Sequence, residues 1–312
     1  MGLTKTSFCP IYRLLTAPIR RHLTRQFRKN NSWPGAVLFY HRVADNDLTD
    51  WTITTSGFEE QLDWLSRSAK IVSLSQIQSG QKVGRRDSLE VALTFDDGYL
   101  ESFQNAIPLL TKRNLPCTFF VSTGFAESGR PFPHDVDKDQ KHAPVTIEMV
   151  KSIAIQGIEI GCHTVTHLDL GQTYDRQRLL FEIRDSRHKL QDWTGQEVRF
   201  FSFPYGMQWN MSQAAIDTIY EAGFDGFVSA YGAWNKIGSD HFHIRRIHAF
   251  RGICHLQNWL TLDPRKIYWE PAFPYVDPTS NPAFNQSQPA SLIPISVPGN
   301  PAGLSSQSES LV

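Results

Sequence analysis

Cysteine is scarce in this sequence, and its cysteines lie far apart. None of the four belongs to a C-x-x-C pair; they are Cys9, Cys117, Cys162 and Cys254. This pattern argues against a disulfide framework or a structural zinc site, and it favours buried, reduced thiols. Net charge is also absent, since 31 basic residues balance 31 acidic ones. No global field would therefore recruit nucleic acid or an anionic surface, whereas a neutral polymer such as a sugar chain is compatible with this balance.

Long apolar runs are missing as well. No run approaches the ~18 residues that a membrane-spanning helix requires, and the cleavage signal of a secretory peptide is absent. We therefore expect a protein of the cytoplasm or of the periphery of a membrane.

Acidic residues are missing from the first 44 positions, which contain no Asp or Glu. Leu15, Ile19, Leu23 and Phe27 recur there at every fourth position among arginines, and this spacing predicts a basic amphipathic helix starting near Pro18. Two roles fit residues 1–33. The helix could dock on the folded domain, or residues 11–29 could make a peripheral contact with a membrane surface.

Basic residues are missing from the other end of the chain. Residues 271–312 carry eight prolines and eight serines and no Lys or Arg, a composition that predicts a disordered tail. The expected folded domain is a single unit spanning residues 34–270.

Within residues 34–270, strand patterns alternate with helical ones. Apolar segments rich in strand formers occur at residues 36–40, 91–95, 117–121, 158–162, 199–203, 226–230 and 243–247. Helical spacing follows a Ser56/Glu59 capping box, recurs from Leu179 to Trp193, and runs again from Ser212 to before Gly223. About seven strand–helix units predict an α/β protein with a closed or nearly closed parallel barrel.

Polar side chains follow four of these strands directly. Asp96 and Asp97 end LTFDDGY, His163 and His167 lie in GCHTVTH, and further groups follow in FSFPYG and LFYHRV. The Asp-Asp-Gly triplet alone could be an ordinary turn. Because chemistry in such folds gathers at the carboxyl ends of the strands, we expect these groups to meet at one rim.

The spacing of His163 and His167 suggests a shared ion. Residues i and i+4 lie on the same face of a helical turn, so two imidazoles could reach one metal. With one carboxylate from FDDG, the set suits a hydrolytic Zn²⁺ site or a non-haem Fe²⁺ oxygenase triad. The strand–helix alternation argues against the oxygenase, which usually uses a β-sandwich.

TFDDG (94–98), HTVTH (163–167) and FSFPYG (201–206), in this order, resemble the signature motifs of the polysaccharide deacetylases, carbohydrate esterase family 4. YHRV (40–43) is similar to the branch that contains the poly-N-acetylglucosamine deacetylases. The resemblance covers roughly residues 36–250. It implies a distorted (β/α)7 TIM-like barrel and a metal-dependent hydrolase that removes acetate from an N-acetylated polysaccharide.

The resemblance also implies roles for individual residues. Asp96 would be the general base, and Asp97, His163 and His167 would hold Zn²⁺ or another divalent metal such as Co²⁺, Ni²⁺ or Fe²⁺. The backbone N–H of Tyr205 would stabilise the oxyanion. His41 would be the catalytic acid, with His248 as the competing candidate.

The sequence departs from the family pattern at two places. The arginine that tunes the catalytic Asp is replaced by Ser202, and either Arg199 or Arg246 could take its part. The tryptophan motif of the acetate pocket is echoed only by Trp234. A hydrolase of a small or lipid-linked amide, such as a deformylase, and an inactive sugar-binding protein remain alternatives. Residues 124–146 form a long polar loop that we expect to shape substrate choice.

Overall fold

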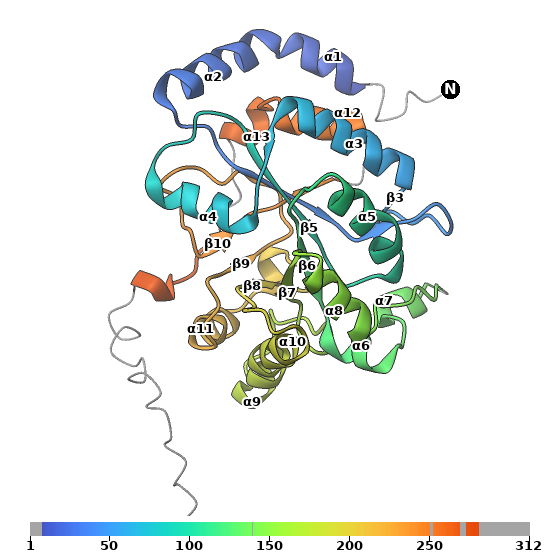
Figure 1. Ribbon diagram of the computed structural model, residues 1–312. Coiled ribbons are helices and arrows are strands. Elements are labelled where there is room, and N and C mark those ends of the chain that lie inside the picture. Colours follow the sequence, from blue (N-terminus) through green and yellow to red (C-terminus); the bar gives the residue numbers. More distant parts are fainter. Residues whose placement is uncertain (1–7, 139, 250–251, 269–272, 281–312) are drawn as a thin grey trace, which may run out of the picture.

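Parallel strands form the centre of the protein, as the computed structural model shows for residues 8–138, 140–249, 252–268 and 273–280 (Figure 1). The main sheet has the order β10-β9-β8-β7-β6-β5-β1-β11, with β4 paired to β5, and every pairing is parallel. Its strands are β1 (Ala36–Tyr40), β4 (Lys70–Ile71), β5 (Glu90–Phe95), β6 (Thr118–Val121), β7 (Glu159–Cys162), β8 (Phe200–Ser202), β9 (Gly226–Val228), β10 (His243–Ile244) and β11 (Ile247–His248). Two short strands, β2 (Arg42–Val43) and β3 (Thr52–Ile53), pair separately. The predicted α/β barrel is confirmed.

A two-residue link joins the two edges of the main sheet. The sequence predicted one strand over residues 243–247, which is wrong: β10 pairs with β9 at one edge of the sheet and β11 pairs with β1 at the other. Only Arg245 and Arg246 separate the two strands. The chain therefore crosses the seam of the barrel at Arg246.

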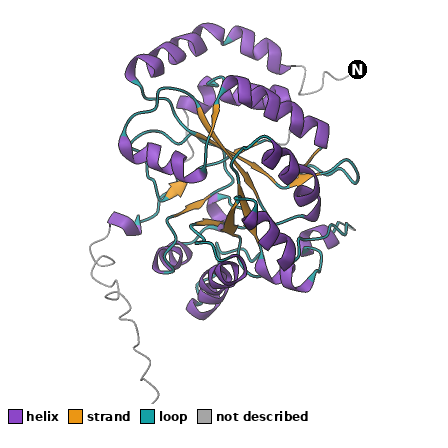
Figure 2. Cartoon of the chain, viewed as in Figure 1, coloured by secondary structure: helices purple, strands orange, loops and turns teal. Residues whose placement is uncertain are grey.

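Helices surround the strands (Figure 2). They are α1 (Phe8–Leu15), α2 (Ala17–Asn30), α3 (Thr55–Ser68), α4 (Leu74–Val83), α5 (Leu100–Lys112), α6 (Thr123–Ser128), α7 (Pro133–Val136), α8 (Ile147–Ile155), α9 (Arg176–Leu180), α10 (Ser186–Thr194), α11 (Gln213–Glu221), α12 (Ile253–Leu260) and α13 (Pro264–Tyr268). A π-helical segment, Phe181–Asp185, joins α9 to α10, and 3-10 turns lie at Gln208–Asn210 and Pro278–Ser280. The cap of α3 is Thr54, whose side chain accepts a hydrogen bond from the Gly57 N–H, and not the predicted Ser56, which already lies in the first turn.

Alternation along the strands fills the barrel in layers. One buried apolar cluster contains Val37, Ala92, Phe120, Phe200, Val228 and Ile244. Residues two positions further along a strand share the same face. On β5 and β8 these are Thr94 and Ser202, which both contact Arg246. Two positions further again, β1 and β5 lead to His41 and Asp96, which both line the cavity described below. Along the inward face of these strands, apolar residues are thus followed by polar residues at the carboxyl ends.

The amino-terminal helices dock on the domain. Leu23 is buried, Tyr12 donates a hydrogen bond to Asp263 (2.8 Å), and Arg20 donates to the Asn258 side chain (2.7 Å) and to the Thr261 carbonyl. Docking, one of the two roles expected for this segment, is therefore confirmed, whereas membrane contact is not supported. Among the described residues, no helix has the length and apolar character that a membrane span needs.

Residues 273–280 also pack on the barrel, although the sequence placed them in the tail. Phe273 and Tyr275 lie against the main core, the Tyr275 hydroxyl donates to Asp240, and the Val276 N–H donates to Gln213. Two aromatic side chains supply the apolar contact that the Pro- and Ser-rich composition concealed. Most of the predicted tail, residues 281–312, lies outside the described residues.

Candidate active site

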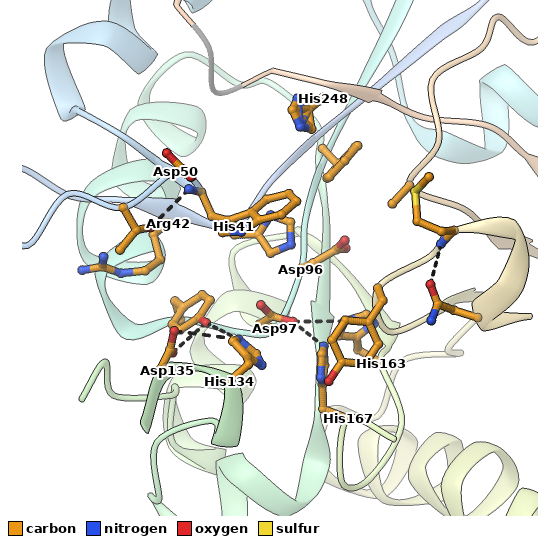
Figure 3. A pocket seen from close by; sticks show the side chains of 18 of the residues that line it. His41, Arg42, Asp50, Asp96, Asp97, His134, Asp135, His163, His167 and His248 are labelled. Atoms are coloured by element: carbon orange, nitrogen blue, oxygen red, sulfur yellow. Dashed lines mark hydrogen bonds and ion pairs between the residues drawn. The ribbon is translucent and has the colours of Figure 1, made fainter. Parts of the chain in front are cut away.

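A cavity of about 980 Å³ opens at the carboxyl ends of the strands. The residues that sequence analysis placed at the rim all line it: His41, Asp96, Asp97, His163, His167, Tyr205 and the competing His248. Figure 3 shows Asp96 and Asp97 at the centre, with His41 to one side and His163 and His167 to the other. The expectation that separate strand ends meet at one place therefore agrees with the geometry.

Arg246 is the partner of Asp96. Its guanidinium donates two hydrogen bonds of 2.7 Å to the two carboxylate oxygens, and both side chains are buried. The guanidinium also lies 4.8 Å from the centre of the Phe39 ring. Burial raises the pKa of Asp96, but Arg246 and then His163 lower it by more, so the pKa lies below its ordinary value. Asp96 is therefore a carboxylate held in its ionised form.

Arg199 was the other candidate for this part, and the structure excludes it. Its side chain donates to Asp225 (2.5 Å) and to Ser75 (2.7 Å) on the outside of the barrel. Trp234 is likewise buried and does not line the cavity, so the expected echo of an acetate-pocket tryptophan is wrong.

Asp97, His163 and His167 bring three ligand atoms together. The Nε2 atoms of His163 and His167 lie 3.1 and 3.2 Å from Asp97 Oδ1. Asp97 Oδ1 is buried and yet accepts no hydrogen bond, which means that the two nitrogens are not aligned as donors to it. His163 Nδ1–H donates to the Ser202 carbonyl (2.7 Å) and so presents Nε2 toward the other two ligand atoms.

This donor set fits a divalent metal. One ligand atom from each of the three residues lies within 4.8 Å of the other two, and all three side chains are buried. Two imidazoles and one carboxylate suit Zn²⁺, and they also suit other first-row divalent ions. A cation at their meeting point would satisfy the orphaned Asp97 oxygen.

The charges of these groups are strongly coupled. Burial raises the pKa of Asp97, but His167 and His163 bring it well below its ordinary value. Burial lowers the pKa of His163, and the Asp97 and Asp96 carboxylates more than reverse this. For His167 burial dominates, and its pKa is lowered. The cluster thus combines a firmly ionised carboxylate with an imidazole that favours the neutral, ligating form.

The two histidines are not on a helical turn, contrary to the expectation from their spacing. Residues 163–170 form an irregular loop after β7, with positive φ at Thr164 (66°) and His167 (56°). The Thr164 hydroxyl accepts from the His167 N–H (2.9 Å). Side-chain hydrogen bonds to the backbone, rather than an i→i+4 ladder, bring the two imidazoles together.

Glu182 holds this loop from beneath, and sequence reasoning missed it. Its buried carboxylate accepts from the N–H groups of Val165 (3.0 Å) and Thr166 (2.9 Å) and from the Thr166 hydroxyl (2.7 Å). Glu182 lies in the π-helical segment, a feature that is frequent at functional sites. A buried carboxylate in an otherwise apolar helical face was the available signal.

Backbone strain marks two further turns at the rim. Asp97 (φ 70°) and Gly98 (φ 83°) both adopt the left-handed region, as do Tyr205 (φ 61°) and Gly206 (φ 59°). The Tyr205 N–H donates to no described residue. The Tyr205 ring is half exposed, and its centre lies 5.0 Å from that of His167.

Two histidines flank Trp51 on the opposite wall. The Trp51 ring centre lies 4.8 Å from that of His41 and 5.7 Å from that of His248. Burial lowers the pKa of His41, and the Asp97 and Asp96 carboxylates only partly offset this. Both histidines line the cavity, and the assignment of the catalytic acid to His41 or His248 stays a prediction.

Residues 124–146 contribute a wall of the cavity, as the sequence led us to expect. His134, Asp135, Lys138 and Gln140 line it, partly from α7. The Tyr99 hydroxyl ties this segment to the end of β5, since it donates to Asp135 (2.8 Å) and lies 3.0 Å from His134 Nε2.

The comparisons with known proteins agree with this site. Residues 84–227 match the family model described as polysaccharide deacetylase, a span that contains Asp96, Asp97 and both histidines. This part of the chain is therefore similar to the polysaccharide deacetylases. The resemblance carried by TFDDG, HTVTH and FSFPYG is therefore confirmed.

Two curated members of the deacetylase family are among its relatives. A putative polysaccharide deacetylase of Bacillus subtilis is 29% identical over 60% of this chain and 62% of its own length. A poly-beta-1,6-N-acetyl-D-glucosamine N-deacetylase of Staphylococcus aureus is 30% identical over 36% of this chain and 38% of its own length. The chain thus matches less than two thirds of either relative.

Solved structures show that the fold is shared. IcaB from Ammonifex degensii superposes with a TM-score of 0.59 at 24% identity, covering 73% of this chain and 95% of that one. The Streptococcus pyogenes deacetylase PplD gives 0.63 at 19% identity, covering 75% and 100%. At these sequence identities the structural similarity supports a shared fold.

Proposed function

We propose that this protein is a metal-dependent N-deacetylase that hydrolyses acetamido groups of an N-acetylglucosamine-type polysaccharide and releases acetate. The observation that carries the proposal is the side-by-side arrangement of an ionised base and a ligand cluster. Asp96, fixed by Arg246, directly precedes Asp97, which meets His163 and His167. Two consecutive residues thus serve different functions, Asp96 as the base and Asp97 as a metal ligand.

The residues would act in order around one acetamido group. Asp97, His163 and His167 would hold Zn²⁺ or another divalent ion, which when bound acidifies water and polarises a carbonyl group. Asp96 is ionised, so it can accept a proton from the attacking water. The Tyr205 N–H would donate to the oxyanion that develops. His41 would give its proton to the departing amine, leaving acetate and a glucosamine unit.

The sugar polymer as substrate is supported by a relative and by the cavity. The Staphylococcus aureus relative is named for poly-N-acetylglucosamine. The cavity, at about 980 Å³, is near the upper end of the roughly 300–1,000 Å³ typical of small-molecule sites, and thus larger than one acetamide needs. An exopolysaccharide of this type would fit both observations.

The direct test is acetate release from N-acetylglucosamine oligomers, measured with chelator and with added Zn²⁺. We expect release that depends on the metal and that Asp96→Asn reduces by about 10²–10⁴-fold. Asp50→Asn is the matched control, because Asp50 lines the same cavity from an exposed position without touching the cluster. Tight metal binding without acetate release would redirect the search to small or lipid-linked amides, and failure to bind any divalent ion would overturn the proposal.

A further inference from the structure

Two tryptophans of the cavity are exposed to an unusual degree. Trp51 and Trp209 are 42% and 61% exposed as whole residues, and both line the cavity. The other tryptophans that the structure describes are buried or partly buried against the core; they are Trp33, Trp64, Trp193, Trp234 and Trp259. The exposed indoles are therefore found at the site and not scattered over the surface, a pattern typical of binding surfaces.

Trp209 stands on a rigid piece of backbone. It lies in the 3-10 turn Gln208–Asn210, where the Asn210 side chain donates to Asp169 (2.6 Å) and accepts from the Met207 N–H (3.2 Å). The Trp209 carbonyl oxygen lies so close to Gly171 that a Cβ there would be 1.9 Å away. An exposed indole on a fixed backbone loses little conformational entropy when a ligand binds.

Trp51 is held with similar firmness on the opposite wall. The backbone N–H of Trp51 donates to the Thr49 hydroxyl (3.2 Å), and its ring packs against that of His41. The buried Arg42 guanidinium donates to the Asp47 carbonyl (2.8 Å) and to the Thr52 hydroxyl (3.1 Å), which fixes both ends of the segment. The segment that carries Trp51 is thus also held in place by its neighbours.

The strand order places the two indoles on either side of the ligand cluster. Trp51 belongs to the segment that continues from β1, and Trp209 follows β8. Between β1 and β8 in the sheet lie β5, β6 and β7, whose ends carry Asp97 and His163. A molecule that touched both tryptophans would therefore pass across the reacting group.

We propose that Trp51 and Trp209 are sugar-binding platforms on the two sides of the metal cluster, and that the substrate is a chain with sugar residues on both sides of the one attacked. An indole offers a flat apolar face that suits the C–H-bearing face of a pyranose, while the hydroxyls of the ring edge stay in water. This inference rests on the proposed deacetylase function. It makes the two tryptophans specificity-determining residues that take no part in the proton transfers.

The test measures kcat and KM for N-acetylglucosamine oligomers of one to six units, with the full chain loaded with Zn²⁺. For the wild type, kcat/KM should rise up to at least three units. Trp51→Ala and Trp209→Ala should each raise KM for the longer oligomers on the order of tenfold and leave the Zn²⁺ content unchanged. Tyr268→Ala, which removes an even more exposed aromatic ring on α13, is the control and should have no effect.

Binding provides a second readout that does not depend on turnover. Calorimetry with the Asp96→Asn variant and a hexamer should show weaker binding when either tryptophan is replaced. A kcat/KM that is independent of chain length, or tryptophan variants with unchanged KM and unchanged hexamer affinity, would overturn this inference while leaving the deacetylase proposal intact. Absence of acetate release from every oligomer by the wild type would instead overturn the proposed function.

Discussion

Replacing Arg246 by Met is the perturbation that the structure predicts most sharply. Arg246 is fully buried, and its two hydrogen bonds to Asp96 are both 2.7 Å long. The variant keeps the apolar volume of the side chain but leaves a buried carboxylate without its partner. Removing one member of a buried ion pair typically costs about 3–5 kcal/mol, so we expect a loss of this size in the free energy of unfolding at pH 7.

The loss should depend on pH with a definite sign. In the native protein the pKa of Asp96 lies below its ordinary value, so the pair contributes stability above about pH 4, and this contribution disappears as the pH falls through the folded-state pKa. In Arg246→Met, burial becomes the dominant effect and raises the pKa of Asp96. The deficit should therefore be largest at neutral pH and shrink as acid protonates the carboxylate.

Urea unfolding of wild type and variant at pH 7 and pH 5, with chelator present throughout, measures both effects. Arg199→Met is the matched control, because the Arg199–Asp225 pair is more than a third exposed on each side and should contribute less than about 1 kcal/mol. Adding Asp96→Asn to Arg246→Met should restore much of the lost stability. A loss no larger than that of Arg199→Met, or one that does not diminish at pH 5, would refute the reasoning.

Three further predictions concern the walls of the site. Glu182→Gln should weaken Zn²⁺ binding about 10–100-fold in a calorimetric titration, because the loop that carries both histidines loses its anchoring carboxylate; unchanged affinity would contradict this role. If His41 is the acid, kcat/KM should fall as the pH rises through a pKa below 6.5, and His41→Gln should abolish this limb, whereas His248→Gln should keep it; the reverse pattern would assign the acid to His248. Gly171→Ala should force the backbone of Trp209 to shift and raise KM for long oligomers, with thermal unfolding as the check on overall stability.

The local sequence pattern was sufficient to predict the strands that lead to the candidate site. Short apolar runs predicted β1, β5, β6 and β7 to within a residue or so, because a strand buried on both faces has few other interpretations. The carboxyl-end rule then placed Asp96 and His163 at one rim without knowledge of the pairing order. These successes rest on features that each strand carries in its own sequence.

The failures concern contacts between distant parts of the chain. Nothing local distinguishes Arg199 from Arg246, since the choice depends on which one crosses the seam of the barrel. The same seam divides residues 243–247. They were predicted as one strand because the hydrophobic pattern of a segment does not show which strands it pairs with. The spacing of His163 and His167 matched a helical turn, but Glu182 and the Thr164 hydroxyl offered the backbone other hydrogen bonds.

The crossing of the chain from one edge of the sheet to the other at Arg246 has a consequence for how the protein matures. Arg246 follows Asp96 by 150 residues, and it reaches the carboxylate only because β10 and β11 join opposite edges of the sheet. During synthesis Asp96 emerges long before the guanidinium that pairs with it. A nascent chain or a proteolytic fragment that stops before Arg246 would carry the TFDDG, HTVTH and FSFPYG motifs and yet leave the Asp96 carboxylate without its partner. The buried Asp96–Arg246 pair therefore requires that both edges of the sheet are in place.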